Sequence, residues 1–215
     1  TVEVELIEDE LNCLVKNNTS LKSIYFIDDT FNVPKDRFKD ILKMLIKNKY
    51  NFKWHSYFRC QYADEEIISL MKESGCEGVF LGIESGSDTI LKNMNKKSTV
   101  EDYRKGIELL KNAGIMTFGA FITGFPGESF KSILETIKFI ESSGLDFYRT
   151  QLWFCEHITP IWNRREEFNI QGEGFEWTHD TMSSKTACSY IEKIFTDIKN
   201  VTWLPQQDFD YENVF

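Results

Sequence analysis

Polar side chains that can bind a small molecule follow two short apolar stretches of this chain. In the stretch GVFLGIESGSD, a nearly unbroken apolar run stops at Glu84 and Ser85. The run SIYFID ends in the same way on Asp28, and Asp29 follows it. A carboxylate accepts hydrogen bonds from hydroxyl and ammonium groups, and a serine hydroxyl can both donate and accept. Such residues can hold a polar ligand, provided that the fold brings them to one place.

The elements that must position these residues are strands and helices in regular alternation. Helical spacing of apolar residues predicts helices at residues 3–17, 34–46, 63–75, 86–113 (one or two helices), 128–142 and 180–199. Apolar or alternating runs of strand length are found at residues 23–28, 51–59, 78–85, 115–125 and 146–154. Residues 156–178 lack a regular period, and the closing segment WLPQQDFDYENVF is expected to be a loop or an extended terminus.

Strands that are each separated by a helix predict a parallel α/β sheet, because parallel neighbours need a crossover connection. The carboxyl ends of parallel strands meet at one edge, where such folds bind their ligands. Polar or small residues stand at every predicted strand end: Asp28, Asp29, Arg59, Glu84, Ser85, Thr123, Gly124 and Gln151. We therefore expect a ligand-binding surface at this edge, although polar loops alone would explain any single position.

The composition is that of a folded protein with an acidic surface. The 215 residues carry a formal net charge of −9, and 41% of them are hydrophobic. Because no basic stripe is present, we expect no nucleic acid as the main partner. No apolar run approaches the ~20 residues of a membrane span, and the pattern of a signal peptide is not seen. We therefore expect no membrane association and a cytoplasmic location.

The cysteines predict neither a disulfide framework nor a zinc site. The chain has five of them, widely scattered and never at C-x-x-C spacing: Cys13, Cys60, Cys76, Cys155 and Cys188. The histidines His55, His157 and His179 are equally isolated, and each is expected to be a structural or surface residue. We therefore predict no metal ligand in this chain, and a reducing compartment suits it best.

Two longer segments carry a family resemblance. GVFLGIESGSDTILKNMNKKSTVEDYRKGIELLKNAGI, followed by FITGFPGES, resembles the central part of the radical S-adenosylmethionine enzymes. IYFIDDTF and the YFR strand resemble the branch of that family that often carries a cobalamin-binding domain upstream. The resemblance implies a core of partial TIM-like (β/α) barrel type at residues 2–155 and a C-terminal extension at 156–215. It also implies S-adenosylmethionine, a 4Fe-4S cluster that generates a 5′-deoxyadenosyl radical, and a possible cobalamin.

The same resemblance implies contacts for the polar strand ends. Asp28 and Asp29 would receive the amino group of S-adenosylmethionine, and Arg59 would pair with its carboxylate. Glu84 and Ser85 would bind the ribose hydroxyls or the methionine moiety. Both of these side chains can face the rim only if the strand breaks at Ser85, because neighbours on a strand point to opposite faces.

The last two predicted strands would hold the adenine. Ile122, Thr123 and Gly124 would lie along the ring, Gln151 stands at the same rim, and Phe154 would flank the ring from the next strand. Structural alternatives remain for several positions. The two aspartates can simply shape a loop, Arg59 can pair with a neighbouring acid, and Gly124 can serve a strand-to-helix turn.

One departure from the family pattern concerns the cluster. The family holds its 4Fe-4S cluster with a CxxxCxxC loop after the first strand. This chain contains no CxxxCxxC, and the one cysteine near its start, Cys13, lies inside the first predicted helix. We therefore expect a core fragment that lacks the first strand and the cluster loop and is inactive alone; a natural homologue without a cluster is the alternative. The exposed sheet edge would then favour self-association.

The predicted function of the intact protein is radical chemistry on a small-molecule or peptide substrate, with methyl transfer as one candidate reaction. Two other hypotheses stay open at this stage. The chain could be a non-catalytic module that binds a nucleotide, or an unrelated TIM-barrel lyase. A lyase of that kind would need a strand-end lysine or a metal site, and neither is evident in the sequence.

Overall fold

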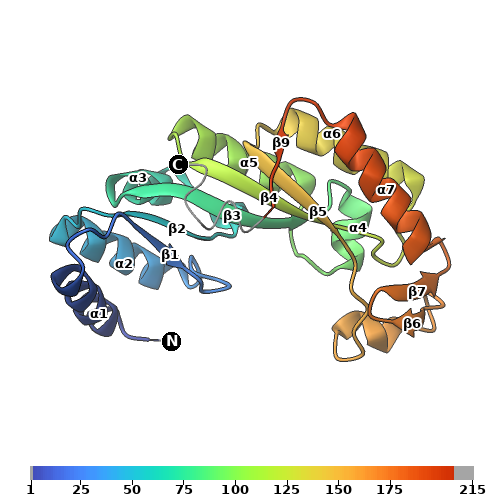
Figure 1. Cartoon of the computed structure of the whole chain (residues 1–215), viewed down its shortest axis with the longest axis horizontal. Coiled ribbons are helices and arrows are strands. Elements are labelled where there is room, and N and C mark those ends of the chain that lie inside the picture. Colours follow the sequence, from blue (N-terminus) through green and yellow to red (C-terminus); the bar gives the residue numbers. More distant parts are fainter. Residues whose placement is uncertain (1, 206–215) are drawn as a thin grey trace. The chain divides into compact units, whose positions relative to one another are not determined.

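The computed structural model describes residues 2–205, which form two compact units. Unit 1 contains the residues up to Leu81 together with Lys105–Phe118. Unit 2 contains Gly82–Arg104 together with the residues from Gly119 onward. Figure 1 labels most of the helices and strands of both units.

Helices and strands alternate along most of the chain, as the sequence predicts. The helices are α1 (Val4–Asn17), α2 (Lys35–Asn48), α3 (Glu65–Glu73), α4 (Asp88–Asn93), α5 (Val100–Asn112), α6 (Phe130–Ser143) and α7 (Ser184–Asp197). The strands of the main sheet are β1 (Ser23–Phe26), β2 (Lys53–Tyr57), β3 (Cys76–Glu84), β4 (Met116–Thr123), β5 (Phe147–Leu152) and β9 (Thr202–Trp203). Short 3-10 helices occur at Cys60–Tyr62 and Pro160–Arg164.

The main sheet has its strands in sequential order, β1-β2-β3-β4-β5, with β9 added beside β5. β1 pairs with β2, β2 with β3, and β5 with β9, each in parallel. The prediction of five parallel strands in sequential order is confirmed. β9 begins one residue before the closing segment 203–215, which was expected to be a loop or an extended terminus, and it includes the first residue of that segment, Trp203. The part of that segment beyond residue 205 lies outside the described residues.

The core of unit 1 follows from the amphipathic pattern of α2. Its residues Phe38, Ile41 and Leu42 are completely buried. Phe31 stands between α2 and β2, with its ring centroid 5.3 Å from that of Phe38 and 6.0 Å from that of Trp54. Burial of each such side chain contributes about 1.5–3 kcal/mol to stability. This packing holds the ends of β1 and β2 in place.

Residues 156–178 are more regular than predicted. β6 (Gln171–Glu173), β7 (Glu176–His179) and β8 (Met182–Ser183) form a small antiparallel sheet in unit 2, and β7 and β8 contact α7. Figure 1 shows β6 and β7 at one end of α7. The expectation of an irregular segment is wrong here, because strands of two to four residues are too short to produce a visible period. The last helix accordingly starts at Ser184, not near residue 180.

The core of unit 2 joins residues from both sides of position 155. Its buried cluster consists of Ile90, Phe125, Trp153, Cys155, Ile161, Ile170, Trp177, Met182 and Ala187. The segment after residue 155 therefore shares its hydrophobic contacts with α4 and with the end of β4. None of the helices between residues 2 and 205 has the length and apolar character to cross a lipid bilayer.

Candidate cofactor site

β3 ends at Glu84 in a left-handed backbone conformation, with φ = 70°. Residues with a side chain adopt this conformation at a cost of roughly 1–2 kcal/mol, and it occurs often at functional positions. The Glu84 carboxylate turns back over Gly82, where an added Cβ would lie 3.0 Å from Oε1. Lys96 Nζ lies 3.2 Å from the same oxygen, and both side chains are about a quarter exposed, 21% for Glu84 and 28% for Lys96. A carboxylate and an ammonium group are thus held together at the end of β3.

Ser85 points to the other side of the sheet. Its side chain is completely buried, and its hydroxyl lies 3.4 Å from the Thr136 hydroxyl on α6. The Gly86 amide also donates to Thr136 Oγ1, at 3.0 Å. A Cβ at Gly86 would come within 2.6 Å of both Thr136 Cα and Phe139 Cβ, so the chain passes directly against α6.

The expectation that Glu84 and Ser85 face the same rim is therefore wrong. The strand breaks at Glu84, one residue earlier than expected, and the contact of Gly86 with α6 draws the Ser85 hydroxyl toward the helix. Glu84 is left as the side chain of this pair that is open to a ligand.

Thr123 also lies on the side of the sheet that α6 covers. Phe121, two residues earlier on β4, packs against Phe139 of α6 with ring centroids 6.1 Å apart. The Thr123 hydroxyl lies 2.8 Å from the Thr150 hydroxyl on β5, and the Thr123 side chain is buried. Thr123 therefore ties the ends of β4 and β5 together from the covered side.

Ile122 and Gln151 face the opposite side, because they alternate with Thr123 and Thr150 along their strands. Gln151 is exposed and Ile122 is half-buried. Glu84 alternates in the same way with the buried Ile83. The face of unit 2 away from α6 thus carries an amide, an apolar side chain and a carboxylate. We call it the open face.

Gly124 follows β4 in a sharp turn, with φ = 97°. Its N–H donates to Glu128 Oε2 at 2.6 Å, and its carbonyl lies 3.1 Å from His179 Nε2. A Cβ at this position would come within 2.4 Å of the Trp177 ring. Glycine is required here both for its backbone conformation and for the space that Trp177 takes.

Two titratable side chains beside this turn are buried, and burial affects them in opposite ways. Burial raises the pKa of Glu128 to about 7, although the Gly124 amide counteracts the rise. Burial lowers the pKa of His179, and its hydrogen bond to Gly124 and the charge of Asp180 partly oppose this. Both effects follow from the cost of placing a charge away from water.

Phe154 lies just beyond the end of β5 and is 46% exposed. Its ring meets that of Phe175 edge to face, with centroids 4.7 Å apart. Two backbone hydrogen bonds of 2.8 Å between Cys155 and Gly174 fix this pair in place. Phe154 is therefore a partly exposed aromatic side chain just beyond a strand end, and its contact with the adenine stays a prediction.

The predicted residues of unit 1 stand at the carboxyl ends of β1 and β2. Asp28 Oδ1 accepts a hydrogen bond from the Thr30 amide at 2.9 Å, so this aspartate shapes the turn after β1. Asp29 is exposed. Arg59 is also exposed, and its backbone is held by the side-chain amide of Asn32 at 2.9 and 3.1 Å. Within residues 2–205, no ion pair to the Arg59 guanidinium is found, so it is available to a ligand.

Three residues of this region were not predicted from the sequence: Lys96, Glu128 and His179. Lys96 belongs to the basic stretch KNMNKKS, which looks like a solvated loop until the contact with Glu84 is seen. His179 lies 55 residues after the glycine that it contacts, and no local pattern marks such a pair. Glu128 closes the segment GAFITGFPGE, where its distance of four residues from Gly124 was the available signal.

The described residues do not supply a metal site. Between residues 2 and 205, no three side chains of histidine, cysteine, aspartate or glutamate are placed so that they could hold a metal ion. Cys60, Cys76 and Cys155 are buried as free thiols, and Cys13 and Cys188 are exposed. The thiolate set of a 4Fe-4S cluster therefore does not fit this part of the chain.

Comparison with known families decides the relationship. Residues 1–140 match the family described as the Radical SAM superfamily. The chain belongs to this superfamily. It is 33% identical over 159 residues to an uncharacterized methyltransferase of Pyrococcus horikoshii, covering 74% of this chain and 34% of the relative. It is 47% identical over 68 residues to a tRNA-2-methylthio-N(6)-dimethylallyladenosine synthase of Anaplasma phagocytophilum, covering 31% of this chain and 15% of the relative.

Solved structures agree on the fold. The radical S-adenosylmethionine methyltransferase TsrM from Kitasatospora setae, solved with cobalamin and a [4Fe-4S] cluster, superposes with a TM-score of 0.64. It is 20% identical, and the match covers 70% of this chain and 31% of TsrM. The predicted fold class, a partial TIM-like barrel of parallel strands and helices, is confirmed. This radical SAM chain spans about a third of the length of the methyltransferase relative.

Proposed function

We propose that the open face of unit 2 binds the nucleoside and part of the methionine of S-adenosylmethionine. The observation that carries this proposal is the conformation of Glu84. A non-glycine residue with φ = 70° stores backbone strain in order to place its carboxylate over Gly82. The carboxylate held in this way is partly exposed and is paired with Lys96, and a ligand-binding role is the explanation that we propose for its conformation.

Glu84 and Lys96 together suit a ligand that carries both hydroxyl and charged groups. The Glu84 carboxylate can accept hydrogen bonds from both ribose hydroxyls or from the methionine ammonium group. Lys96, whose Nζ lies 3.2 Å from the Glu84 carboxylate, can exchange this partner for a carboxylate of the ligand. Ser85 and Thr123 act from the covered side, where they fix the strand ends through Thr136 and Thr150.

The adenine would lie along the end of β4. Ile122 supplies an apolar surface, and the Gly124 turn allows the backbone to approach the ring. Gln151 and Phe154 would contact the ligand from β5, through an amide and an aromatic ring respectively. Within unit 1 taken by itself, Asp28, Asp29 and Arg59 are proposed to bind an amino and a carboxylate group.

For the whole protein we propose radical SAM chemistry, with methyl or methylthio transfer to a small-molecule or peptide substrate as the reaction class. The support is the family match and the methyltransferase and methylthio-forming relatives. Because residues 2–205 do not offer the cluster ligands, no step through a 4Fe-4S cluster is assigned to residues of this chain. Cobalamin, which is bound in the TsrM structure, is a proposed cofactor of the whole protein.

A second candidate is a module that binds the nucleotide without catalysis. Both candidates require the same binding surface. The family match removes the hypothesis of an unrelated TIM-barrel lyase.

Calorimetric titration of the 215-residue chain tests the proposal. We expect saturable 1:1 binding of S-adenosylmethionine and weaker binding of 5′-methylthioadenosine, which keeps the nucleoside but lacks the charged end. Methionine, which has no nucleoside, serves as the matched control and should bind least. A chain that folds normally but binds neither nucleoside contradicts both candidate functions.

A further inference from the structure

The C-terminal segment reaches back to the turn after β4 through one histidine. His179 is the last residue of β7 and is only 7% exposed. Its Nε2 lies 3.1 Å from the Gly124 carbonyl oxygen. On the other side of the same glycine, the N–H donates to Glu128. Both polar groups of the Gly124 backbone are thus held by buried side chains, and one of these comes from the C-terminal hairpin.

The hydrogen-bond partners of His179 define its tautomer. A carbonyl can only accept, so Nε2 must carry the proton that bonds to Gly124. Nδ1 lies 3.4 Å from the Thr181 amide and 3.2 Å from its hydroxyl, so this nitrogen accepts. The neutral ring satisfies both contacts, and burial favours the same state by lowering the pKa of His179. His179 therefore acts as a fixed donor.

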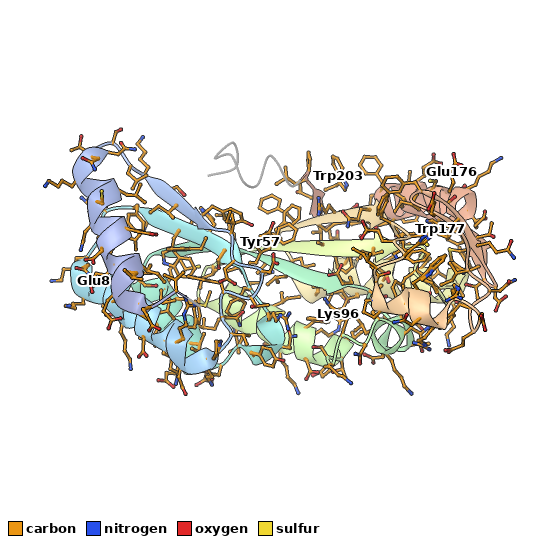
Figure 2. The ribbon with its side chains drawn as sticks, turned by 90° about the horizontal axis from the view of Figure 1, so that it is seen from below. Glu8, Tyr57, Lys96, Glu176, Trp177 and Trp203 are labelled. Carbon is orange, nitrogen blue, oxygen red and sulfur yellow. The ribbon has the colours of Figure 1, made fainter. Side chains whose placement is uncertain are left out.

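Trp177 fixes the histidine in this position. The two rings stack with centroids 5.1 Å apart and an interplanar angle of 7°. The indole N–H donates to the Trp153 carbonyl at 2.9 Å, and the same ring fills the space beside the Gly124 Cα. Figure 2 shows Trp177 in this hairpin with its exposed neighbour Glu176. The hairpin is therefore locked to the end of β5 as well as to the Gly124 turn.

We propose that His179 is a positioning residue for the nucleoside site: it holds the Gly124 carbonyl and thereby fixes the turn along which the adenine lies. The inference rests on the proposed function, because Gly124 matters for binding only if the nucleoside lies there. It assigns a role to the hairpin after β5, which would otherwise be a peripheral extension of the sheet. His179 itself does not touch the ligand; it acts through the backbone of Gly124.

Three variants test this role: His179→Ala, His179→Gln and His157→Ala. Glutamine can place an amide N–H near the position of Nε2, so it should restore the bond to Gly124. His157 lies in the same segment but is half exposed and pairs with Glu173 at the surface, so it is the matched control. Amide hydrogen exchange of Gly124 and Glu128 reports on the turn, and titration with 5′-methylthioadenosine reports on binding.

For His179→Ala we expect exchange of these amides to accelerate, and 5′-methylthioadenosine to bind about fivefold more weakly. His179→Gln should recover most of both effects, and His157→Ala should match the wild type. Unchanged exchange or unchanged affinity in a folded His179→Ala variant overturns the role of His179 while the proposed function stands. If the wild type does not bind 5′-methylthioadenosine, the proposed function fails, and the role of His179 fails with it.

Discussion

Replacing Glu84 with alanine is expected to weaken the binding of S-adenosylmethionine by about 1–3 kcal/mol, the usual cost of losing a charged hydrogen-bond partner. This corresponds to roughly a 5- to 150-fold rise in Kd. Stability should change little, because the side chain is partly exposed and alanine adopts φ = 70° no more easily than glutamate does. Calorimetric titration and thermal unfolding of the same variant measure the two effects.

Two further variants test whether the loss of affinity is due to the Glu84 carboxylate itself or to its surroundings. Glu77→Ala removes a carboxylate at the other end of β3, where it lies 3.7 Å from His55, and should leave the affinity unchanged. Lys96→Ala breaks the ion pair but keeps Glu84, so it should weaken binding less than Glu84→Ala does. Glu84→Ala with unaltered affinity and a lower melting temperature would show that the pair is structural.

Replacing Glu128 with glutamine is expected to stabilise the protein at pH 8 by up to about 3 kcal/mol. The pKa of Glu128 is about 7 in the folded state, against an ordinary value near 4.5. Between these values the folded state binds more protons than the unfolded state, so the Glu128 contribution to stability falls as pH rises from about 4.5 to 7. Glutamine avoids this loss, and its amide oxygen can still accept the hydrogen bond from Gly124.

The measurement is urea unfolding of wild type and Glu128→Gln at pH 5 and pH 8. The advantage of the variant should be large at pH 8 and small at pH 5. His179 has the opposite dependence: its lowered pKa means that its contribution is lost as pH falls below about 6.5. Because the wild type and Glu128→Gln both contain His179, its contribution does not enter the difference between their stabilities at a given pH. Glu108→Gln, an exposed position on α5, is the control. An equal stability difference at both pH values would contradict a buried Glu128 whose pKa is raised.

Strands β1 to β5 were predictable from sequence because they are apolar or alternating runs of at least four residues separated by amphipathic helices. β3 shows this best. Six of its nine residues form the run GVFLGI, and the strand ends at Glu84, the first charged residue after that run. The β6–β8 sheet was missed because only Trp177, His179 and Met182 of its strand residues are buried. β9 was not predicted, because a strand of two residues is too short to show an alternating pattern.

The sequence predicts the location of the candidate site better than it predicts the individual contacts within it. The pattern of polar strand ends led to Glu84 and Gln151, since the end of a strand follows from local pattern, and the family resemblance led to Phe154. The direction of a side chain after a strand break does not follow from the local sequence pattern, because it depends on residues that are distant in the sequence. The contact of Gly86 with α6 turned Ser85 away from the open face, and the approach of His179 to Gly124 depends on a hairpin far along the chain.

The most direct test of the central claim is the map of backbone amide chemical shifts of the ¹⁵N-labelled chain as S-adenosylmethionine is added. The claim is that the ligand lies on the open face of unit 2. The largest shift changes are therefore expected at Gly82, Glu84 and Gly124, with smaller changes elsewhere. Largest changes at the groove of unit 1 that Ile68 and Leu109 line, or no changes at saturating ligand, would contradict it.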